Sequence, residues 1–234
     1  MEMQTGDNAH LDNYNSIQRS GLQGWGNSLI DQQIEKNIKR KEGFKILELG
    51  ASSGEHLSYV KDEPIWDSYI CLDINPGATN PKLYQNIVSK KSKSYSRVKF
   101  VKANAESLPF NDSTFDLVVA TCLLAHVDQP ELVLQEARRV TKNKGQIIIG
   151  LPCDPGIVNR MTKFMVTYPK MKRIGITDPK LSYARDHKNP INNLIVIIKY
   201  VFRQDKINLK YQPLRIKSWN LNLFVILVCN LNKS

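Results

Sequence analysis

Apolar residues recur along residues 44–152 in short runs that have the length of β-strands. Each run is bounded by polar or glycine-containing turns, a pattern typical of strands. The run Phe115–Ala120 is almost wholly apolar, as strands covered on both faces of a sheet tend to be. We expect strands at residues 45–49, 69–72, 98–101, 115–120 and 146–149.

Helical periods flank and separate these strands. Residues 23–41 place apolar side chains, among them Ile30 and Ile34, at helical spacing, which predicts an amphipathic helix before the first strand. Residues 128–141 begin with Asp128 as a cap, followed by a proline and a glutamate, which predicts a second helix. Strands that alternate with helices imply a parallel sheet covered on both sides, so we expect a doubly wound α/β fold.

The alternation of predicted strands and helices ends after Pro152. Residues 153–190 are basic and interrupted by prolines, and residues 190–202 then predict a helix that is apolar nearly all round. Two further strands are expected at residues 206–211 and 221–228. The prediction is therefore a seven-stranded, mostly parallel sheet with a helical insertion between strands five and six.

The turn after the first strand is the first candidate binding element. Gly50 and Gly54 allow close backbone approach, and Ser53 is expected to cap a helix whose Leu57 faces inward. Asp73 closes the second strand, where a carboxylate can accept hydrogen bonds from ribose hydroxyl groups. Ligands bind at the carboxyl ends of the strands in such sheets, so the pattern indicates a nucleoside site.

The chain resembles the class I S-adenosylmethionine-dependent methyltransferases, specifically the methyltransferase type 11 group that includes ubiquinone and menaquinone biosynthesis enzymes. This resemblance covers about residues 44–152, and it implies a Rossmann-like fold. It is carried, in order, by residues 46–54, Leu72-Asp73, residues 103–110, 115–118, 124–127 and 137–145.

S-adenosylmethionine is the cofactor that the resemblance implies. The turn from Glu48 to Gly54 would hold the methionine part, Asp73 the ribose and Ile74 the adenine. The family usually has Gly at Ser52 and often Asp at Asn104; Ser52 is small enough to keep the turn, and the Asn104 carbonyl can still accept a hydrogen bond. The expected cofactor-binding residues are Glu48, Gly50, Ala51, Ser52, Gly54, Asp73, Ile74, Asn104, Ala105 and Thr121.

Structural alternatives exist for three of these residues. Glu48 is either a cofactor contact or a strand carboxylate, and a carboxylate in an apolar strand needs a partner. Asp73 is alternatively an ordinary turn residue, and Asn104 an ordinary loop residue.

Catalytic candidates are harder to assign, because methyl transfer needs a general base only when the acceptor carries a proton at the reacting atom. His126 follows strand four, and Asp154 follows strand five on the same side of the sheet. Arg185, Asp186 and His187 precede the apolar helix; His187 could act as a base oriented by the Asp186 carboxylate, and Arg185 could bind an anion. Each of these candidates has a structural alternative as a core or loop residue.

Net charge bears on the acceptor. The chain carries a net charge of +11, and residues 1–150 hold 18 basic and 18 acidic side chains, so the whole excess lies in residues 151–234. A positive field concentrates anionic partners. We therefore expect an anionic small-molecule, glycan or lipid-linked acceptor. The helix at residues 190–202 is expected to be buried in the core, to cover an apolar acceptor pocket or to make peripheral membrane contact.

The resemblance and the charge together suggest one methyltransferase domain over residues 1–234. We divide it into a cofactor-binding core at 44–152, an acceptor-side insertion at 153–205 and a C-terminal strand pair at 206–234. The four cysteines are too far apart to suggest a zinc site or a disulfide framework, so no metal is expected. Neither a secretory signal nor a membrane-spanning run is recognisable, and a cytoplasmic location is the default.

Three competing functions are weighed. An RNA methyltransferase agrees with the charge, but the sequence shows no RNA-binding module, and nucleic acid is not the favoured acceptor. Residues 120–123 also lack the Asn-Pro-Pro-Tyr-like signature of amino methylation. A nicotinamide-dependent oxidoreductase is disfavoured by the missing third glycine of its fingerprint. A non-catalytic protein that keeps the fold is the third alternative.

Overall fold

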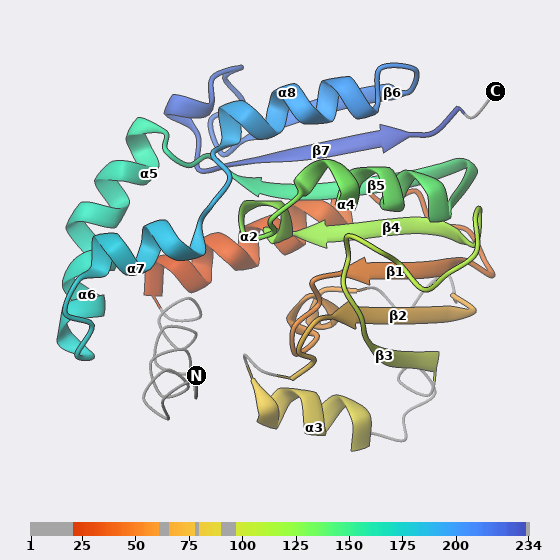
Figure 1. The fold of residues 1–234 in the computed structure, drawn as a ribbon, viewed down its shortest axis with the longest axis horizontal. Helices are drawn as coiled ribbons and strands as arrows, with labels where there is room; N and C mark the ends of the chain where they lie inside the picture. Colours follow the sequence, from red (N-terminus) through yellow and green to blue (C-terminus); the bar gives the residue numbers. More distant parts are fainter. Residues whose placement is uncertain (1–20, 61–65, 78–79, 90–96, 233–234) are drawn as a thin grey trace.

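A computed structural model describes residues 21–60, 66–77, 80–89 and 97–232 of the chain. Its centre is a seven-stranded sheet in the order β3-β2-β1-β4-β5-β7-β6 (Figure 1). Strands β1 to β5 run parallel, whereas β7 runs antiparallel to both β5 and β6. The strands are β1 (Lys45–Leu49), β2 (Ser68–Asp73), β3 (Val98–Lys102), β4 (Phe115–Thr121), β5 (Thr141–Pro152), β6 (Lys206–Gln212) and β7 (Phe224–Asn230). The predicted seven-stranded, mostly parallel sheet is confirmed.

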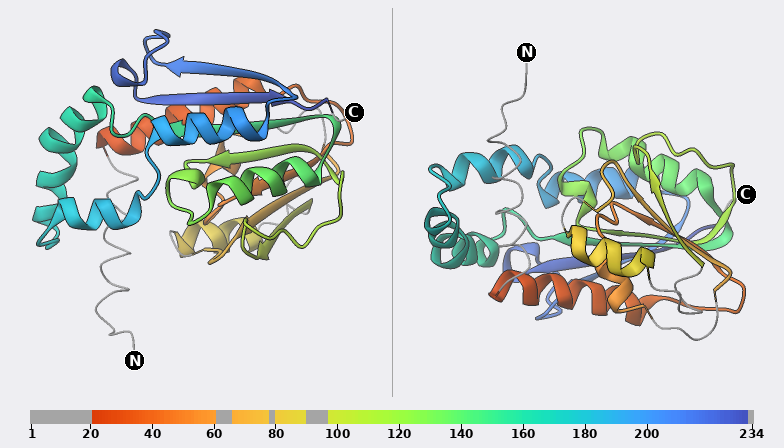
Figure 2. Two further views of the ribbon diagram at one scale, coloured as in Figure 1. Left: turned by 45° about the horizontal axis from the view of Figure 1, so that its top comes forward. Right: turned by 90° about the horizontal axis from the view of Figure 1, so that it is seen from below.

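Helices cover both faces of the sheet (Figures 1 and 2). One face packs against Ile30 and Ile34 of the first described helix, and the other packs against two helices that also contact each other. The described helices are α2 (Gly21–Asn37), α3 (Pro81–Ser89), α4 (Pro130–Val140), α5 (Ile157–Thr162), α6 (Tyr168–Arg173), α7 (Pro179–Asp186) and α8 (Ile191–Val201). Because both faces are buried, the central strands read as continuous apolar runs.

Helix α8 supports the burial alternative for the apolar helix. It packs on α4, and its Ile191, Leu194 and Ile198 are at most 1% exposed. The side of the helix that carries Ile191, Leu194 and Ile198 therefore forms part of the core. No helix in the described part of the chain is both long and apolar enough to cross a bilayer.

The insertion between β5 and β6 is where the sequence-based prediction is most incomplete. Helices α5, α6 and α7 occupy the stretch that the prolines seemed to break up, and the π-helical turn Lys163–Thr167 joins α5 to α6. In Figure 1 these helices gather beyond the arrowheads of β4 and β5, which places them at the carboxyl ends of the strands. We call this side of the sheet the carboxyl edge.

Two predicted helix caps are wrong. Residues Glu55–Ser58 form a 3₁₀ turn after Gly54, and the Ser53 hydroxyl instead accepts a hydrogen bond from the Asn80 amide at 2.6 Å. Helix α4 begins at Pro130 after Gln129, because the Asp128 carboxylate pairs with Lys188. In both places a partner distant in sequence takes the side chain that local pattern assigned to the cap.

Candidate functional site

The carboxyl edge collects most of the residues expected at the cofactor. Gly50 follows β1, Asp73 and Thr121 end β2 and β4, and Asn104 lies two residues after β3. Because these four strands are parallel neighbours, their carboxyl ends meet at one edge. The structure thus places the residues of the proposed cofactor site along the same side of the sheet.

Backbone hydrogen bonds fix the turn after β1 to the end of β2. The Ser52 amide donates to Asp73 Oδ2 at 2.8 Å, and the Asn75 amide donates to Asp73 Oδ1 at 2.8 Å. The Gly77 amide donates to the Ser52 carbonyl at 2.9 Å. Ser52 itself has a φ of 51°, in the left-handed region that favours glycine. The chain therefore keeps the turn geometry even though serine replaces the family's usual glycine.

Other residues expected at the cofactor differ in exposure. Ile74 is 67% exposed, whereas Ala51 and Ala105 are buried. Asn104 is exposed, and its side-chain oxygen accepts the Glu106 amide at 2.9 Å, which leaves one lone pair for a ligand. The two alanines are available mainly through their backbone.

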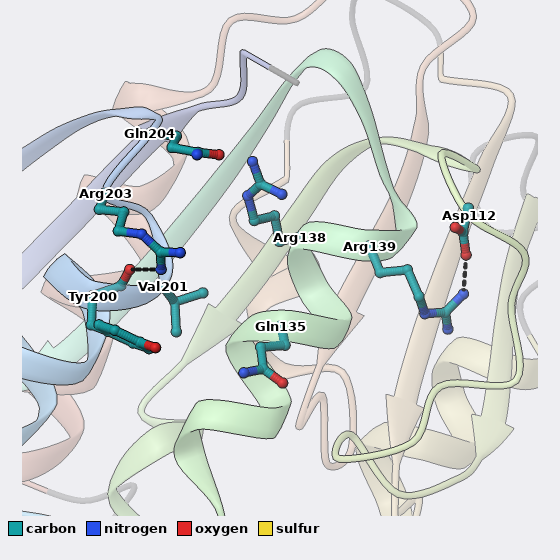
Figure 3. Close-up of a pocket in the computed structure, with 8 residues that line it drawn as sticks. All are labelled: Asp112, Gln135, Arg138, Arg139, Tyr200, Val201, Arg203 and Gln204. Carbon is teal, nitrogen blue, oxygen red and sulfur yellow. Dashed lines mark hydrogen bonds and ion pairs between the residues drawn. The ribbon is translucent and has the colours of Figure 1, made fainter. Parts of the chain in front are cut away.

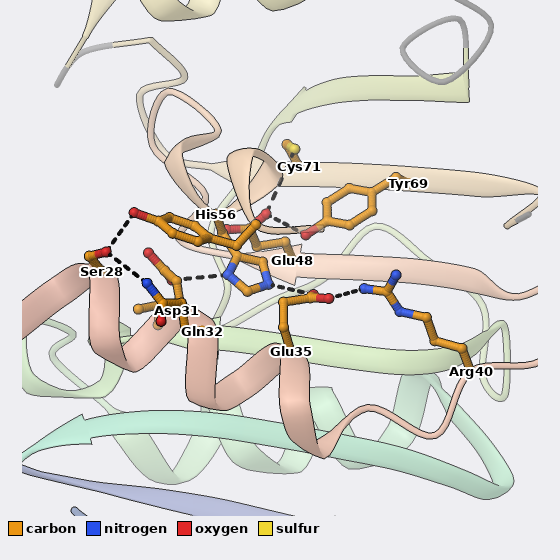
Figure 4. A network of polar contacts seen from close by, with 11 residues as sticks. Ser28, Asp31, Gln32, Glu35, Arg40, Glu48, His56, Tyr69 and Cys71 are labelled. Atoms are coloured by element: carbon orange, nitrogen blue, oxygen red, sulfur yellow. Dashed lines mark hydrogen bonds and ion pairs between the residues drawn. The ribbon is translucent and has the colours of Figure 1, made fainter. Parts of the chain in front are cut away.

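Glu48 is buried within a charged network (Figure 4). It is 3% exposed, and the Tyr69 hydroxyl donates to Glu48 Oε2 at 2.7 Å. The sequence had left open whether this carboxylate contacts the cofactor or has another partner in the strand. The structure shows that the Tyr69 hydroxyl is such a partner.

Helix α2 supplies two further carboxylates to this network. His56 Nδ1 lies 2.9 Å from Asp31 Oδ1, and His56 Nε2 lies 3.3 Å from Glu35 Oε1. Arg40 pairs with Glu35, and the Thr121 hydroxyl donates to Asp31 at 3.3 Å. We call Asp31, Glu35, Arg40, Glu48 and His56 the buried charge network. It connects α2 to the turn that follows β1 and to the end of β4.

Two pKa values follow from this arrangement. Burial raises the pKa of Glu48 to about 7, although the charge of His56 and the Tyr69 hydrogen bond act against that shift. Burial opposes the charged form of His56, but the carboxylates of Asp31 and Glu35 outweigh it and raise the His56 pKa to about 10. His56 is therefore positively charged at neutral pH.

Sequence reasoning missed this network. Its partners come from α2, β1 and the turn after β1, so no local pattern shows the pairing. One signal was present: Asp31 and Glu35 adjoin the apolar Ile30 and Ile34 in the helix, and acidic residues beside an inward-facing stripe need a buried partner.

A second group of side chains combines His126, which follows β4, with two residues at the end of α7. His126 Nδ1 lies 3.3 Å from Asp186 Oδ1 and 2.9 Å from the Asp186 backbone carbonyl. His187 Nδ1 lies 3.4 Å from Asp186 Oδ2, and the two imidazole centroids are 4.6 Å apart. We call His126, Asp186 and His187 the acceptor-side cluster. The sequence suggested Asp186 as the carboxylate that orients His187, but not its contact with His126.

Asp154, the third catalytic candidate, joins this region indirectly. Its carboxylate pairs with Lys163, whose ammonium group lies 4.1 Å from the centre of the Tyr183 ring. That ring stacks on His187 at 3.9 Å. Asp154 thus holds Lys163 beside the cluster. Arg185 lies exposed on α7, one residue before the cluster's carboxylate.

The two histidines of the cluster differ electrostatically. Burial disfavours the charged form of both, but the hydrogen bonds to Asp186 prevail at His126 and raise its pKa. At His187 burial prevails and lowers the pKa. Burial alone would raise the pKa of Asp186, but the hydrogen bonds from His126 and His187 outweigh it and lower that pKa. Within the cluster, the raised pKa favours the charged form of His126, and the lowered pKa favours the neutral form of His187.

A metal ion is an alternative occupant of the cluster. Ligand atoms of its three residues lie within 4.8 Å of one another. Two imidazoles and one carboxylate are also a common ligand set for divalent cations. The hydrogen bonds to Asp186 explain the same geometry without a metal, and a chelator distinguishes the two.

A shallow pocket of about 530 Å³ lies elsewhere, between the ends of α4 and α8 (Figure 3). Helix α4 ends immediately before β5 begins, so the pocket is at the opposite edge of the sheet. Arg138 pairs with Asp205, and Arg139 pairs with Asp112 and Glu136. These carboxylates neutralise two of its arginines, and the pocket takes no part in the site at the carboxyl edge.

Comparison with known proteins agrees with this geometry. Residues 47–149 match a family model described as a methyltransferase domain. The fold is that of class I S-adenosylmethionine-dependent methyltransferases. The methyltransferase domain implies S-adenosylmethionine as the cofactor, and the resemblance found in the sequence is confirmed at the level of the family.

Relatives of the methyltransferase domain occur in archaea and bacteria. An uncharacterized protein of Methanocaldococcus jannaschii is 32% identical over 131 residues, which cover 55% of this chain and 51% of that protein. A ubiquinone/menaquinone biosynthesis C-methyltransferase of Rhizobium etli is 26% identical over 114 residues, covering 48% and 43%. The chain thus spans about half the length of these curated relatives.

Solved structures share the fold. A putative S-adenosylmethionine-dependent methyltransferase from Methanococcus maripaludis superposes with a TM-score of 0.63 at 13% identity. The superposition covers 100% of this chain and 97% of that protein. The likeness therefore includes the sheet and the helices inserted between β5 and β6.

The carboxyl edge of the methyltransferase domain fits this cofactor. Both Asp73 oxygens accept backbone amides yet retain lone pairs for ribose hydroxyl groups. Ile74 leaves 67% of its surface open next to that carboxylate, which suits a flat adenine ring. A Cβ atom at Gly50 would lie 2.8 Å from Leu123 Cδ1, so the turn has no room for a larger residue there.

Proposed function

We propose that the protein transfers a methyl group from S-adenosylmethionine to an anionic acceptor of the small-molecule, glycan or lipid-linked type. One observation carries the proposal. His126 follows β4 and contacts Asp186 at the end of α7, so the acceptor-side cluster extends from the edge at which the expected cofactor residues lie. The residues expected to bind the methyl donor and the acceptor-side cluster therefore lie at the same edge of the sheet.

The positive charge of the C-terminal part supports an anionic acceptor. All eleven excess positive charges lie in residues 151–234. His126 adds an imidazole whose raised pKa favours the charged form, and its side chain is 35% exposed, against 10% for His187. His126 is thus the more accessible of the two, and its charge can pair with an anionic group on the acceptor.

Each residue of the cluster receives a distinct role in the proposal. When bound, S-adenosylmethionine supplies a methyl group already activated by a positive sulfonium. His126 holds the acceptor's anionic group, and Asp186 orients both imidazoles. His187 is neutral, and Asp186 lies at its Nδ1, so Nε2 is the atom that takes a proton when the acceptor carries one. Asp154 acts as a positioning residue by holding Lys163 near the ring that stacks on His187.

A methyl-transfer assay with labelled S-adenosylmethionine tests the proposal. The acceptor panel contains phosphate-bearing small molecules, a demethylmenaquinol, glycans and RNA oligonucleotides. We expect transfer to an anionic non-nucleic-acid acceptor, and RNA as the sole acceptor would contradict that part. Binding of S-adenosylmethionine without transfer to any of the panel would favour a non-catalytic protein.

Variants of the two histidines separate their roles. His126→Gln is expected to raise KM for the acceptor, since it removes the cation that holds the substrate. His187→Gln is expected to lower kcat about 10²-fold or more for a protonated acceptor, the usual size of general-base catalysis. Neither variant should change the affinity for S-adenosylmethionine. An unchanged KM in His126→Gln together with an unchanged kcat in His187→Gln would remove the cluster from the mechanism.

A chelator decides between the hydrogen-bonded cluster and the metal alternative. We expect full activity in EDTA. Loss of activity that a divalent cation restores would assign His126, Asp186 and His187 as metal ligands instead.

A further inference from the structure

Helix α5 and the π-helical turn after it carry an exposed apolar surface that the methyltransferase fold does not use. Two of its residues lie one helical turn apart on α5, and the other two are adjacent in the π-helical turn. We call Ile157, Met161, Phe164 and Met165 the apolar stripe. These residues are 54, 57, 71 and 69% exposed, respectively.

The opposite side of the same helical segment packs inward. Thr167 and Met171 are at most 1% exposed. Lys163, from the π-helical turn, pairs with Asp154 and lies over the Tyr183 ring. One side of the segment therefore borders the acceptor-side cluster, while the other presents four large apolar side chains to solvent.

Positive charge surrounds the apolar stripe. Residues 155–177 contain five basic side chains and no acidic one. Arg160, Lys172 and Arg173 are exposed, and no ion pair to them is found among residues 21–60, 66–77, 80–89 and 97–232. A helix with large apolar side chains on one side and basic residues beside them is typical of segments that lie in the interface of an anionic bilayer.

We propose that the apolar stripe seats the protein on the surface of an anionic phospholipid membrane. Phe164, Met165, Met161 and Ile157 enter the region between headgroups and acyl chains, and Arg160, Lys172 and Arg173 contact lipid phosphates. Charge complementarity selects this occupant, because a water-soluble apolar partner would not require the run of unopposed basic residues. The membrane then lies on the far side of the helix from Lys163 and the acceptor-side cluster.

This surface differs from the one that the sequence suggested for membrane contact. Helix α8 directs Ile191, Leu194 and Ile198 into the core and leaves Val196 exposed at 67%. Val196 therefore provides a matched control, as an apolar side chain of similar exposure outside the apolar stripe.

Co-sedimentation with vesicles tests the proposal. Vesicles of phosphatidylcholine alone are compared with vesicles that also contain phosphatidylglycerol, at low and moderate salt. We expect binding that requires phosphatidylglycerol and weakens with salt. Phe164→Gln with Met165→Gln should lower the partition coefficient about a hundredfold, since each of the two apolar side chains contributes about a tenfold factor. Lys172→Gln with Arg173→Gln should lower it about 5-fold for each charge. Val196→Gln should leave it unchanged.

Other outcomes overturn the proposal. Binding that ignores phosphatidylglycerol, or that Val196→Gln reduces as much as the Phe164 and Met165 pair, removes the apolar stripe as the membrane contact. A dimer in solution that dissociates when Phe164 and Met165 are replaced would assign the stripe to a second copy of the chain. Thermal unfolding of each variant checks that it is folded. The assay needs no methyl transfer, so its failure leaves the proposed function untouched.

Discussion

Replacing Gly50 by alanine should destabilise the protein through two separate costs. Gly50 has a φ of 67°, and the left-handed conformation costs a residue with a Cβ about 1–2 kcal/mol. The added Cβ would also lie 2.8 Å from Leu123 Cδ1, and overpacking of this kind costs about 1–3 kcal/mol. Alanine restricts the unfolded chain, which returns about 0.4–1 kcal/mol. We therefore expect a net loss of about 2–4 kcal/mol.

Gly175 provides a control that separates these costs. It has a φ of 91°, but a Cβ there would meet no atom within 4 Å. Gly175→Ala should therefore cost about 1 kcal/mol, from backbone strain less the gain in the unfolded state. In a chain of 234 residues, each kcal/mol lowers Tm by about 2–4 °C. Thermal and urea unfolding, followed by circular dichroism, measure both variants.

Leu123→Ala tests whether the contact with Leu123 is responsible. Adding Gly50→Ala to that variant should cost only about 1 kcal/mol, similar to the cost at Gly175. Affinity for S-adenosylmethionine should fall in Gly50→Ala and stay constant in Gly175→Ala. Equal destabilisation at the two glycines, with no relief from Leu123→Ala, would refute the reasoning that Leu123 limits the cofactor turn.

Three further predictions concern Asp73 and the buried charge network. Asp73→Asn should weaken S-adenosylmethionine binding about tenfold or more, because hydrogen bonds to a carboxylate contribute about 1.5–3 kcal/mol each. Calorimetry measures the affinity, and an unchanged value would exclude Asp73 from the ribose site. The pKa of His56 is raised from 6.5 to about 10 in the folded protein, so its contribution to stability is complete below pH 6.5 and disappears as the pH rises to 10. Urea unfolding should show this decline of the unfolding free energy with pH in the wild type and a flatter decline in His56→Gln. Equal pH slopes in the two proteins would contradict the prediction. Tyr69→Phe leaves the buried Glu48 without its hydroxyl donor and should cost about 1–3 kcal/mol of unfolding free energy, whereas a fully stable variant would show that water replaces the donor.

The parts of the fold that the sequence predicts are those with a local pattern. Strand β4 is buried on both faces, so its apolar run is visible without any knowledge of its neighbours. The turn at Gly50 and the carboxylate of Asp73 stand at strand ends, and parallel strands bring such ends to one edge. Fold and cofactor site therefore follow from short segments read in order.

The parts that the sequence does not predict depend on contacts between distant segments. His56 meets Asp31 across 25 residues, and His126 meets Asp186 across 60. A helical insertion was expected here, but the individual helices α5 to α7 could not be placed. Pro169 and Pro179 occupy first-turn positions of separate helices, where proline is tolerated, and so looked like breaks. The apolar side chains of α5 are largely exposed, so the usual inward-facing pattern was also missing.

Calorimetric titration of the folded protein with S-adenosylmethionine tests the central claim most directly. The account predicts saturable one-to-one binding that Asp73→Asn weakens and Asp178→Asn, a substitution in the exposed cap of α7, leaves unchanged. A folded protein that gives no binding heat at several temperatures and no shift of Tm with S-adenosylmethionine would contradict the assignment of the carboxyl edge as the cofactor site.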